Sequence, residues 1–315
     1  MGLPSVTVIG AGQVGATTAH LLALKCLAHV TLLDIVEGLA QGKAMDLSQS
    51  APMEGFHGAV RGTTDFHAMA GSRLIVITAG LPRKPGMSRE DLLAANANIV
   101  GPIADQIAAV APDAVVIVVT NPLDLMVALT LARTRFPRTR VMGMAGVLDS
   151  ARLRAFIAQR LGVPSADVQA MVLGSHGDLM VPLRRSITVH GEPVTTHIPP
   201  QELEQLLQRT RDGGAEIVKL LKQGSAFYAP ASGVVEMARA ILNDTHAVVP
   251  VCAWLEGEYG LREVCIGVPA QLGAAGIERI VELDLAPDER QALIASAAQV
   301  REGIKSLTVR SASTP

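Results

Sequence analysis

The fold of the first half of the chain is decided by the stretch Val6-Thr7-Val8-Ile9-Gly10-Ala11-Gly12-Gln13-Val14-Gly15. A β-branched run leads directly into the glycines, and a helical pattern follows them to Lys25. In such a loop the first glycine permits a tight turn, the second lets the backbone approach a pyrophosphate, and the third lets the helix pack on the strand. The helix N-terminus also presents unpaired N–H groups to phosphates. The loop therefore predicts a dinucleotide site formed by Gly10, Ala11, Gly12, Gln13, Val14 and Gly15.

A carboxylate follows the second apolar run. Asp34 stands 19 residues after Gly15, where an acidic side chain can accept hydrogen bonds from both ribose hydroxyls. It would repel a 2′-phosphate, and the neighbouring Ile35 and Val36 supply no cation, so the pattern favours NAD over NADP. Two alternatives stay open. Asp34 could cap a helix, because Glu37 follows three residues later, and an S-adenosylmethionine-dependent enzyme could share these features.

Strand and helix patterns alternate around this loop. The apolar runs are continuous, as expected of strands that helices cover on both faces. We expect strands at 6–9, 30–33, 74–78, 115–119 and 141–142, and helices at 12–25, 38–48, 89–110 and 124–133. This order predicts an α/β fold whose first domain, residues 1–145, is a doubly wound parallel sheet of the Rossmann type.

The pattern changes in the second half. We expect helices at 150–161, from 200, from 230 to about 242 and at 287–307, and strands at 168–173, 186–189, 248–253 and 264–268. Separate runs of strands and helices predict an α+β substrate domain over residues 146–315. No repeat or Pro/Ser-rich linker divides the halves, so we expect a packed boundary.

The composition excludes several functional classes. The 27 Lys and Arg residues nearly balance the 29 Asp and Glu residues. The sequence therefore has no excess of positive charge that would favour binding to a nucleic acid or an anionic membrane. No apolar stretch reaches the roughly 18 residues of a membrane span, and the N-terminus shows no targeting signal. The three cysteines, Cys26, Cys252 and Cys265, are too few and too scattered for a disulfide framework or a zinc site. We therefore expect a cytoplasmic protein without a bound metal.

A basic loop follows the strand expected at 74–78. Its sequence, Gly80-Leu81-Pro82-Arg83-Lys84-Pro85-Gly86-Met87-Ser88-Arg89, combines glycine and proline with three cations at the edge of the sheet where ligands bind. The segment has the composition of a lid that closes over an anionic substrate and excludes water. The alternative is an ordinary solvated basic loop.

Two further segments carry groups suited to catalysis. Asp149 and Arg152 share a helix face, where they could pair with each other. Alternatively, Arg152 could clamp a carboxylate through two hydrogen bonds while Asp149 orients a histidine. His176 lies between small residues in Gly174-Ser175-His176-Gly177-Asp178, where a substrate can reach its ring. A histidine can donate and accept a proton near neutral pH.

Three more motifs complete the set. They are Gly42-Lys43-Ala44-Met45-Asp46-Leu47, Asn121-Pro122-Leu123-Asp124 and Gly224-Ser225-Ala226-Phe227-Tyr228-Ala229-Pro230. Together with the glycine loop, the basic loop and the histidine segment, they resemble the NAD-dependent lactate/malate dehydrogenase family. Within that family the sequence is most similar to the lactate-dehydrogenase-like malate dehydrogenases. The motifs stand in the family's order from residue 6 to about residue 273.

The resemblance implies hydride transfer between malate and oxaloacetate, with roles for five residues. His176 would be the acid/base, and Asp149 would hold its ring and stabilise the charged form. Arg89 would polarise the reacting carbonyl, and Arg152 would bind the adjacent carboxylate. Arg83 would select the substrate, since the family's malate dehydrogenases have arginine at this lid position and its lactate dehydrogenases have glutamine. An arginine fork matches the second carboxylate of oxaloacetate.

The resemblance also assigns the cofactor contacts. Asn121 would bind the substrate near the nicotinamide together with Val119, and Asn96 would contact NAD from the helix after the lid. Two positions depart from the family pattern. Ser175 replaces a common glycine, which restricts the backbone slightly, and Ala226 replaces a threonine that is common in lactate dehydrogenases, which argues against lactate.

The expected partners follow from the same comparison. The substrate would be a small dicarboxylate in the tricarboxylic acid cycle, with neither a nucleic acid nor a membrane partner. The resemblance implies a homodimer or homotetramer, with residues 38–48 and 154–160 as candidate interface faces, and an ordinary amphipathic surface is the alternative for both segments. Two alternatives stay open: a dehydrogenase for lactate or another 2-hydroxyacid, and an inactive NAD-binding module. The inactive module predicts the loss of at least one catalytic residue, and all are present.

Overall fold

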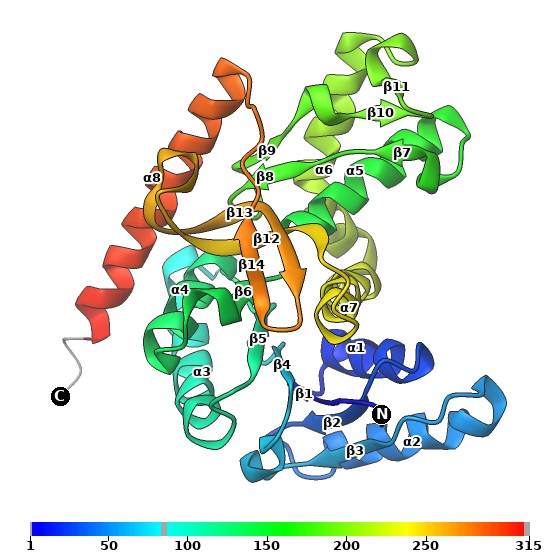
Figure 1. Cartoon of the computed structure of the whole chain (residues 1–315), viewed down its shortest axis with the longest axis vertical. Helices are drawn as coiled ribbons and strands as arrows, with labels where there is room; N and C mark the ends of the chain where they lie inside the picture. The colour runs from blue at the N-terminus through cyan, green and yellow to red at the C-terminus, as the bar shows by residue number, and fades with distance from the viewer. Residues whose placement is uncertain (1, 83–86, 312–315) are drawn as a thin grey trace. The chain divides into compact units, whose positions relative to one another are not determined.

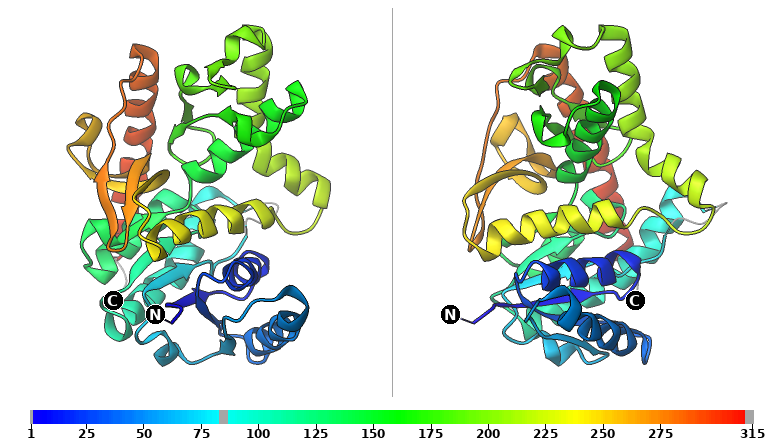
Figure 2. Two further views of the ribbon diagram at one scale, coloured as in Figure 1. Left: turned by 45° about the vertical axis from the view of Figure 1, so that its right-hand side comes forward. Right: turned by 90° about the vertical axis from the view of Figure 1, so that its right-hand side faces the viewer.

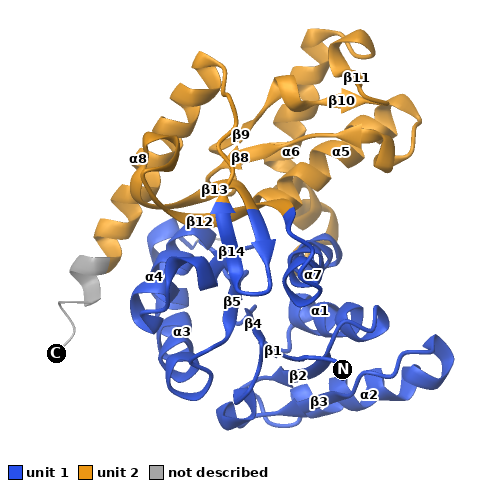
Figure 3. Cartoon of the chain, in the orientation of Figure 1, with its two compact units in different colours: residues 1–144, 227–247, 271–279 blue, residues 145–226, 248–270, 280–315 orange. Residues whose placement is uncertain are grey.

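The computed structural model describes residues 2–82 and 87–311 (Figure 1). Its contacts divide the chain into two compact units, coloured in Figure 3. Unit 1 contains residues 1–144, 227–247 and 271–279, and unit 2 contains residues 145–226, 248–270 and 280–315. Each unit therefore combines segments that lie far apart in the sequence. The domain ranges 1–145 and 146–315 stay a prediction.

Unit 1 is built on a parallel sheet. Its strands lie in the order β3 (Val60–Thr63), β2 (His29–Leu33), β1 (Ser5–Ile9), β4 (Leu74–Ile77), β5 (Val115–Val118) and β6 (Val141–Gly143). Every residue of β4 and β5 is buried, which explains their continuous apolar sequences. Strand β1 pairs with β2 on one side and with β4 on the other. The direction of winding reverses there, and ligands of such sheets bind at the carboxyl ends of the strands beside this reversal. The prediction of a Rossmann-type sheet is confirmed.

Five α-helices surround this sheet. They are α1 (Gln13–Leu24), α2 (Leu39–Glu54), α3 (Arg89–Val110), α4 (Leu123–Thr134) and α7 (Tyr228–Leu242), with short 3₁₀ turns η1 (Phe66–Met69) and η2 (Arg138–Arg140). Helix α7 comes from the second half of the sequence but packs along α1 (Figure 2). Helix α2 continues past the predicted end at residue 48, through Pro52, and stops where Gly55 adopts a φ of 76°. A left-handed glycine, not the proline, therefore ends this helix.

Strand β3 was missed by the sequence analysis. Val60-Arg61-Gly62-Thr63 carries one large apolar residue, because β3 is an edge strand that pairs with β2 alone. A Cβ atom at Gly62 would overlap the Ala40 carbonyl, so glycine lets α2 pack directly on this strand.

Unit 2 combines short strands with helices, as predicted. Its elements are α5 (Gly146–Leu161), η3 (Ser165–Asp167), β7 (Val168–Gln169), β8 (Val172–Gly174), β9 (Met180–Pro182), η4 (Arg184–Ser186), β10 (Thr188–Val189), β11 (Glu192–Pro193), η5 (Val194–Thr196), α6 (Pro200–Leu221), η6 (Glu258–Gly260) and α8 (Pro287–Ser311). Three strands have residues in both units: β12 (Ala247–Glu256), β13 (Arg262–Gly273) and β14 (Gly276–Ile280). The strand expected at 168–173 is two strands, which pair with different neighbours.

One apolar core of unit 2 lies between α5, α6 and the short strands. It includes Leu153, Ile157, Val172, Ile187 and Leu207. Helix α8 packs against β8 and β9. Over the part of the chain that the structure describes, no helix combines the length and the apolar character required to span a membrane.

Candidate active site

The glycine loop leaves β1 and enters α1 as predicted. Gly10 adopts a φ of 102°, and a Cβ atom there would lie 2.6 Å from the backbone nitrogen of Ala79. A Cβ atom at Gly15 would overlap the Gly10 carbonyl oxygen. The hydroxyl of Thr78 donates to the Gly10 carbonyl at 3.0 Å, which fixes the loop against β4. Backbone conformation and packing therefore explain two of the three glycines.

Gly12 has a different surrounding. Its backbone is extended, with φ −65° and ψ −168°, and a Cβ atom there would meet no atom of residues 2–82 and 87–311 within 4 Å. The protein itself therefore does not require glycine at this position. Gly12 is the residue before α1, and no side chain caps the helix N-terminus. A pyrophosphate that approaches the backbone would use this open space, so the loop fits a dinucleotide.

The two glycines predict different results on substitution. Gly12→Ala is expected to weaken NADH binding by at least about tenfold, with an unfolding free energy within about 0.5 kcal/mol of the wild type. Gly15→Ala is expected to destabilise the fold by about 1–3 kcal/mol, because the new methyl group overlaps the Gly10 carbonyl. NADH fluorescence titration and urea unfolding measure the two quantities. Equal destabilisation by both variants would contradict this assignment.

Asp34 lies at the end of β2, beside the loop. Its Oδ2 accepts a hydrogen bond from the Ala11 N–H at 2.6 Å, and its Oδ1 accepts one from the Val36 N–H at 3.0 Å. Helix α2 begins only at Leu39, after Gly38, so Asp34 is not a helix cap. The sequence analysis gave no role to Lys43, which donates from α2 to the Ala11 carbonyl at 2.7 Å. Two charged side chains thus hold the peptide groups of Ala11.

An asparagine side chain forms hydrogen bonds with the segments that follow β4 and β5. Asn96 on α3 is fully buried, and its Oδ1 accepts a hydrogen bond from the Leu81 N–H at 2.7 Å. Its Nδ2 donates to the Leu81 carbonyl at 3.1 Å and to the Asn121 carbonyl at 2.6 Å. Asn121 itself is exposed and precedes a cis peptide bond to Pro122, and Val119 is half-buried. Asn96 therefore fixes the backbone on both sides of this edge, and its contact with NAD stays a prediction.

Arg89 and Arg83 were predicted from the basic loop. Arg89 is exposed at the first residue of α3. The preceding Ser88 and Asp91 form a reciprocal cap, with Ser88 Oγ accepting from the Asp91 N–H at 3.0 Å and Asp91 Oδ2 accepting from the Ser88 N–H at 3.1 Å. The cap fixes the start of the helix and thereby the backbone of Arg89. Arg83 lies outside the described residues.

The structure brings together three predicted residues in unit 2. His176 Nδ1 lies 2.9 Å from Asp149 Oδ2, and Arg152 Nη1 lies 3.4 Å from Asp149 Oδ1. The Asp149 side chain is 2% exposed, whereas that of His176 is 18% exposed. A carboxylate at this distance can accept a hydrogen bond from the Nδ1–H of His176. Asp149 therefore contacts both the arginine and the histidine, and its role in orienting His176 stays a prediction.

Arg152 is a half-buried cation, with its side chain 13% exposed, and one of its donors has no acceptor among the described residues. Burial lowers the pKa of its guanidinium, and the charge of Asp149 opposes that shift. Arginine nevertheless keeps its proton in proteins. Its Nε is buried and has no hydrogen-bond acceptor among the described residues. Gly213 and Gly214 of α6 lie beside the side chain, where Cβ atoms would come within 3.4 Å and 3.8 Å of it. A half-buried guanidinium with a spare, buried N–H is suited to a carboxylate ligand.

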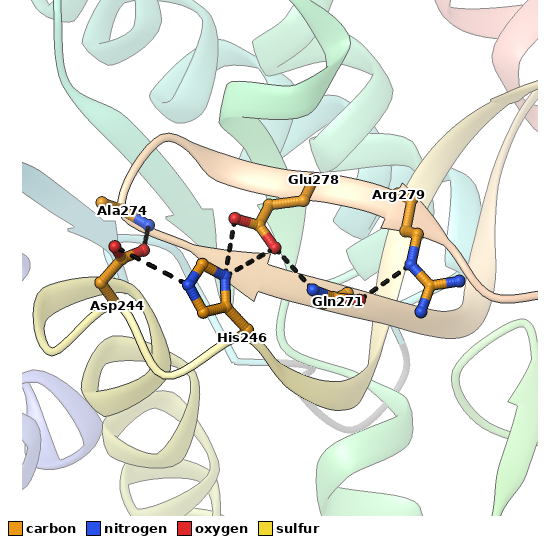
Figure 4. A network of polar contacts seen from close by, with 6 residues as sticks. All are labelled: Asp244, His246, Gln271, Ala274, Glu278 and Arg279. Carbon is orange, nitrogen blue, oxygen red and sulfur yellow. Dashed lines mark hydrogen bonds and ion pairs between the residues drawn. The ribbon is translucent and has the colours of Figure 1, made fainter.

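A separate polar cluster lies in unit 1, after α7 and on the β13–β14 hairpin (Figure 4). Asp244, His246 and Glu278 are exposed, and they form the one group of potential metal ligands found in residues 2–82 and 87–311. His246 Nδ1 lies 2.9 Å from Glu278 Oε1, whereas its Nε2 lies 3.9 Å from Asp244 Oδ2. One cation can bind only one ring nitrogen, so this arrangement suits a protonated imidazole between two carboxylates better than a metal.

The cluster predicts a pH-dependent contribution to stability. The hydrogen bond that His246 donates to Glu278, the charge of Glu278 and the charge of Asp244 raise the pKa of His246 above its ordinary 6.5. Because the pKa is raised in the folded state, the stabilisation is complete below about pH 6.5 and is lost as the pH rises through the folded value. NMR titration should show Glu278→Gln lowering this pKa more than Asp244→Asn. An equal pKa of His246 in the wild type and in both variants would show that these carboxylates do not raise it.

Family models, related sequences and solved structures all match this chain to lactate and malate dehydrogenases. The family model for the lactate/malate dehydrogenase NAD binding domain matches residues 5–143, and that for the lactate/malate dehydrogenase alpha/beta C-terminal domain matches residues 146–309. A malate dehydrogenase of Nostoc punctiforme is 54% identical over 303 residues, which cover 96% of this chain and 93% of the relative.

Two solved structures illustrate the structural similarity. The malate dehydrogenase of Salinibacter ruber superimposes with a TM-score of 0.94 at 45% identity, covering 98% of this chain and all of the other. The lactate dehydrogenase of Cryptosporidium parvum, complexed with lactic acid and NAD, superimposes with a TM-score of 0.95 at 40% identity, covering both chains completely. Enzymes for two substrates thus share this fold, so the fold alone does not select between them.

Proposed function

The chain belongs to the lactate/malate dehydrogenase family, and we propose that it interconverts (S)-malate and oxaloacetate with NAD as cofactor. The contact between His176 Nδ1 and Asp149 Oδ2 at 2.9 Å is the observation on which this proposal rests most heavily. It supplies an oriented proton donor and acceptor for an alcohol–ketone interconversion. The glycine loop, with open space at Gly12, supplies the cofactor site.

His176 carries the proton in this proposal. In the reduction of oxaloacetate, the protonated ring gives its Nε2 proton to the carbonyl oxygen, and in malate oxidation the neutral ring takes it back. Asp149 accepts from Nδ1–H throughout, so it orients the ring and stabilises the charged form. When bound, NADH supplies the hydride to the carbonyl carbon and NAD⁺ receives it in the reverse direction.

The substrate contacts come from cationic and amide side chains. Arg152 binds the carboxylate next to the reacting carbon through its unused Nε–H and a terminal N–H. Arg89 polarises the carbonyl oxygen, and Asn121 donates a hydrogen bond to the substrate. Val119 and Asn96 belong to the cofactor site in the same proposal. The exposure of Arg89 and Asn121 supports their assignment as ligand contacts.

Arg83 selects oxaloacetate over pyruvate. A guanidinium pairs with the second carboxylate of oxaloacetate, whereas pyruvate would leave it without a partner. An enclosed, unpaired charge costs about 3 kcal/mol after allowance for contact with water, which corresponds to roughly a hundredfold preference.

We also infer a homodimer or homotetramer that acts in the cytoplasm, in the tricarboxylic acid cycle. Exposed apolar side chains on α2 support an interface, since Met45 is 64% exposed and Met53 is 83% exposed. The free cysteines Cys26, Cys252 and Cys265 are typical of a reducing compartment. Sedimentation analysis of the wild-type protein and of Met53→Lys tests the interface, and two monomeric proteins would contradict it.

The decisive experiment compares NADH oxidation with oxaloacetate and with pyruvate. We expect roughly a hundredfold preference for oxaloacetate in kcat/KM, and we expect Arg83→Gln to reduce it to within about tenfold of unity. Lys84→Gln, next to it in the loop, is the matched control and should keep the preference. Equal wild-type rates, or a preference for pyruvate, would favour a lactate dehydrogenase. NADH binding without either activity would support the inactive module.

A further inference from the structure

The C-terminal helix α8 presents two buried polar side chains to the hairpin that contains the histidine loop. Glu289 is 7% exposed and Ser296 is 1% exposed. The two residues are seven positions apart, which is about two helical turns, so they lie on the same face of α8. Within unit 2, helix α8 packs against both β8 and β9. Polar groups this deeply buried require hydrogen-bond partners.

Both side chains accept backbone hydrogen bonds at the ends of this hairpin. Ser296 Oγ accepts from the Ser175 N–H at 2.8 Å. Glu289 Oε1 accepts from the Arg184 N–H at 3.0 Å, while its Oε2 accepts from the Ala286 N–H at 2.9 Å and caps α8. Ser175 directly follows β8, and Arg184 stands two residues after β9. Helix α8 therefore holds the hairpin at both ends of its ladder, at the loop that follows β8 and at the segment that follows β9.

The Ser296 contact lies next to the catalytic histidine. The ladder between β8 and β9 ends at the pair Gly174 and Met180, and the next N–H group, that of Ser175, donates to Ser296. Gly174 has a φ of 86°, so the backbone turns sharply just before His176. The bonded N–H belongs to the Gly174–Ser175 peptide, which fixes the Cα of Ser175, the residue directly before His176. A hydrogen bond to this peptide thus acts on the histidine–carboxylate geometry.

We propose that Ser296 is a positioning residue for the acid/base histidine. Its hydroxyl holds the Ser175 peptide, and this peptide holds the His176 ring against Asp149 and toward the substrate. The proposal rests on the proposed dehydrogenase function. It gives the C-terminal helix a role in the reaction itself, because a serine 120 residues after His176 fixes the position of the proton donor.

Kinetics of Ser296 variants test the proposal. Ser296→Ala removes the acceptor and is expected to lower kcat for oxaloacetate reduction about tenfold, with the NADH dissociation constant changed less than about twofold. Ser296→Thr keeps the hydroxyl and should recover kcat to within about threefold of the wild type. The matched control is Thr210→Val, because Thr210 is also fully buried on a helix of unit 2 and donates to the Leu206 carbonyl at 2.8 Å. It should change kcat by less than about twofold.

Amide hydrogen exchange provides a readout that does not depend on activity. In Ser296→Ala, the Ser175 amide should exchange at least about tenfold faster, whereas the amides of α5 should keep their wild-type rates. Faster exchange together with the selective loss of kcat supports the proposal. An unchanged kcat overturns it even if exchange accelerates, and so does a loss that Ser296→Thr does not recover or that Thr210→Val reproduces. A wild-type protein inactive with both oxaloacetate and pyruvate would instead refute the proposed function, and the role of Ser296 with it.

Discussion

Replacing His176 by asparagine is expected to lower kcat for oxaloacetate reduction by about a thousandfold. Asparagine can form hydrogen bonds but cannot transfer a proton in either direction. The nitrogen Nδ1 is already engaged by Asp149 at 2.9 Å, so the proton must pass through Nε2, and no other histidine contacts Asp149 among the described residues. The dissociation constant of NADH should change by less than about twofold, since the glycine loop supplies the cofactor site. Steady-state kinetics and NADH fluorescence measure the two effects.

A second histidine in unit 2 offers a matched control. His190 is exposed and has a φ of 50°, a conformation that asparagine tolerates, so His190→Asn should leave kcat and folding unchanged. Asp149→Asn should give an intermediate loss of about a hundredfold, because the imidazole remains but loses its anionic partner. If His176→Asn retained more than about a tenth of the wild-type kcat, His176 could not be the principal acid/base.

The parts of the fold predicted from the sequence are those with long or repeated apolar patterns. Strands such as β1, β4 and β5 are covered on both faces, and their continuous apolar runs identify them without further information. Strands β3, β9, β11 and β14 were missed because they are short or lie at edges, where few large apolar residues are required. Their positions depend on tertiary pairing, which local sequence does not encode.

The residues of the candidate site also fall into a group that the sequence predicted and a group that it did not. The residues that we propose act on ligands stand in short motifs, so Gly12, Asp149 and His176 were selected from their immediate neighbours. The residues that hold those motifs in place were missed. Lys43 contacts a carbonyl 32 positions earlier, and Ser296 contacts an amide 121 positions earlier. A lone serine or lysine on a helix carries no sequence pattern, and only the packed structure gives it a partner.

Replacing Arg152 by glutamine is expected to lower kcat/KM for oxaloacetate by about a thousandfold, or about 4 kcal/mol of transition-state binding. Arg152 is half-buried beside Asp149, and its buried Nε has no acceptor among the residues that the structure describes. In the proposed mechanism, a substrate carboxylate supplies that acceptor and offsets the cost of desolvating the guanidinium. Most of the loss should therefore fall on the KM for oxaloacetate, with NADH affinity unchanged. Steady-state kinetics with both substrates varied separates these quantities.

Arg152→Lys distinguishes carboxylate binding from simple pairing with Asp149. Lysine keeps the positive charge but lacks the planar fork, so a two-bond clamp predicts a loss of about a hundredfold even though the charge remains. If Arg152 served only to neutralise Asp149, lysine would restore activity, and glutamine would mainly lower the thermal midpoint. Such a result would remove Arg152 from substrate binding and leave the substrate carboxylate to cations of the basic loop. A kinetic loss in Arg152→Lys without a loss of stability would instead show that the fork geometry, and not charge alone, recognises the substrate.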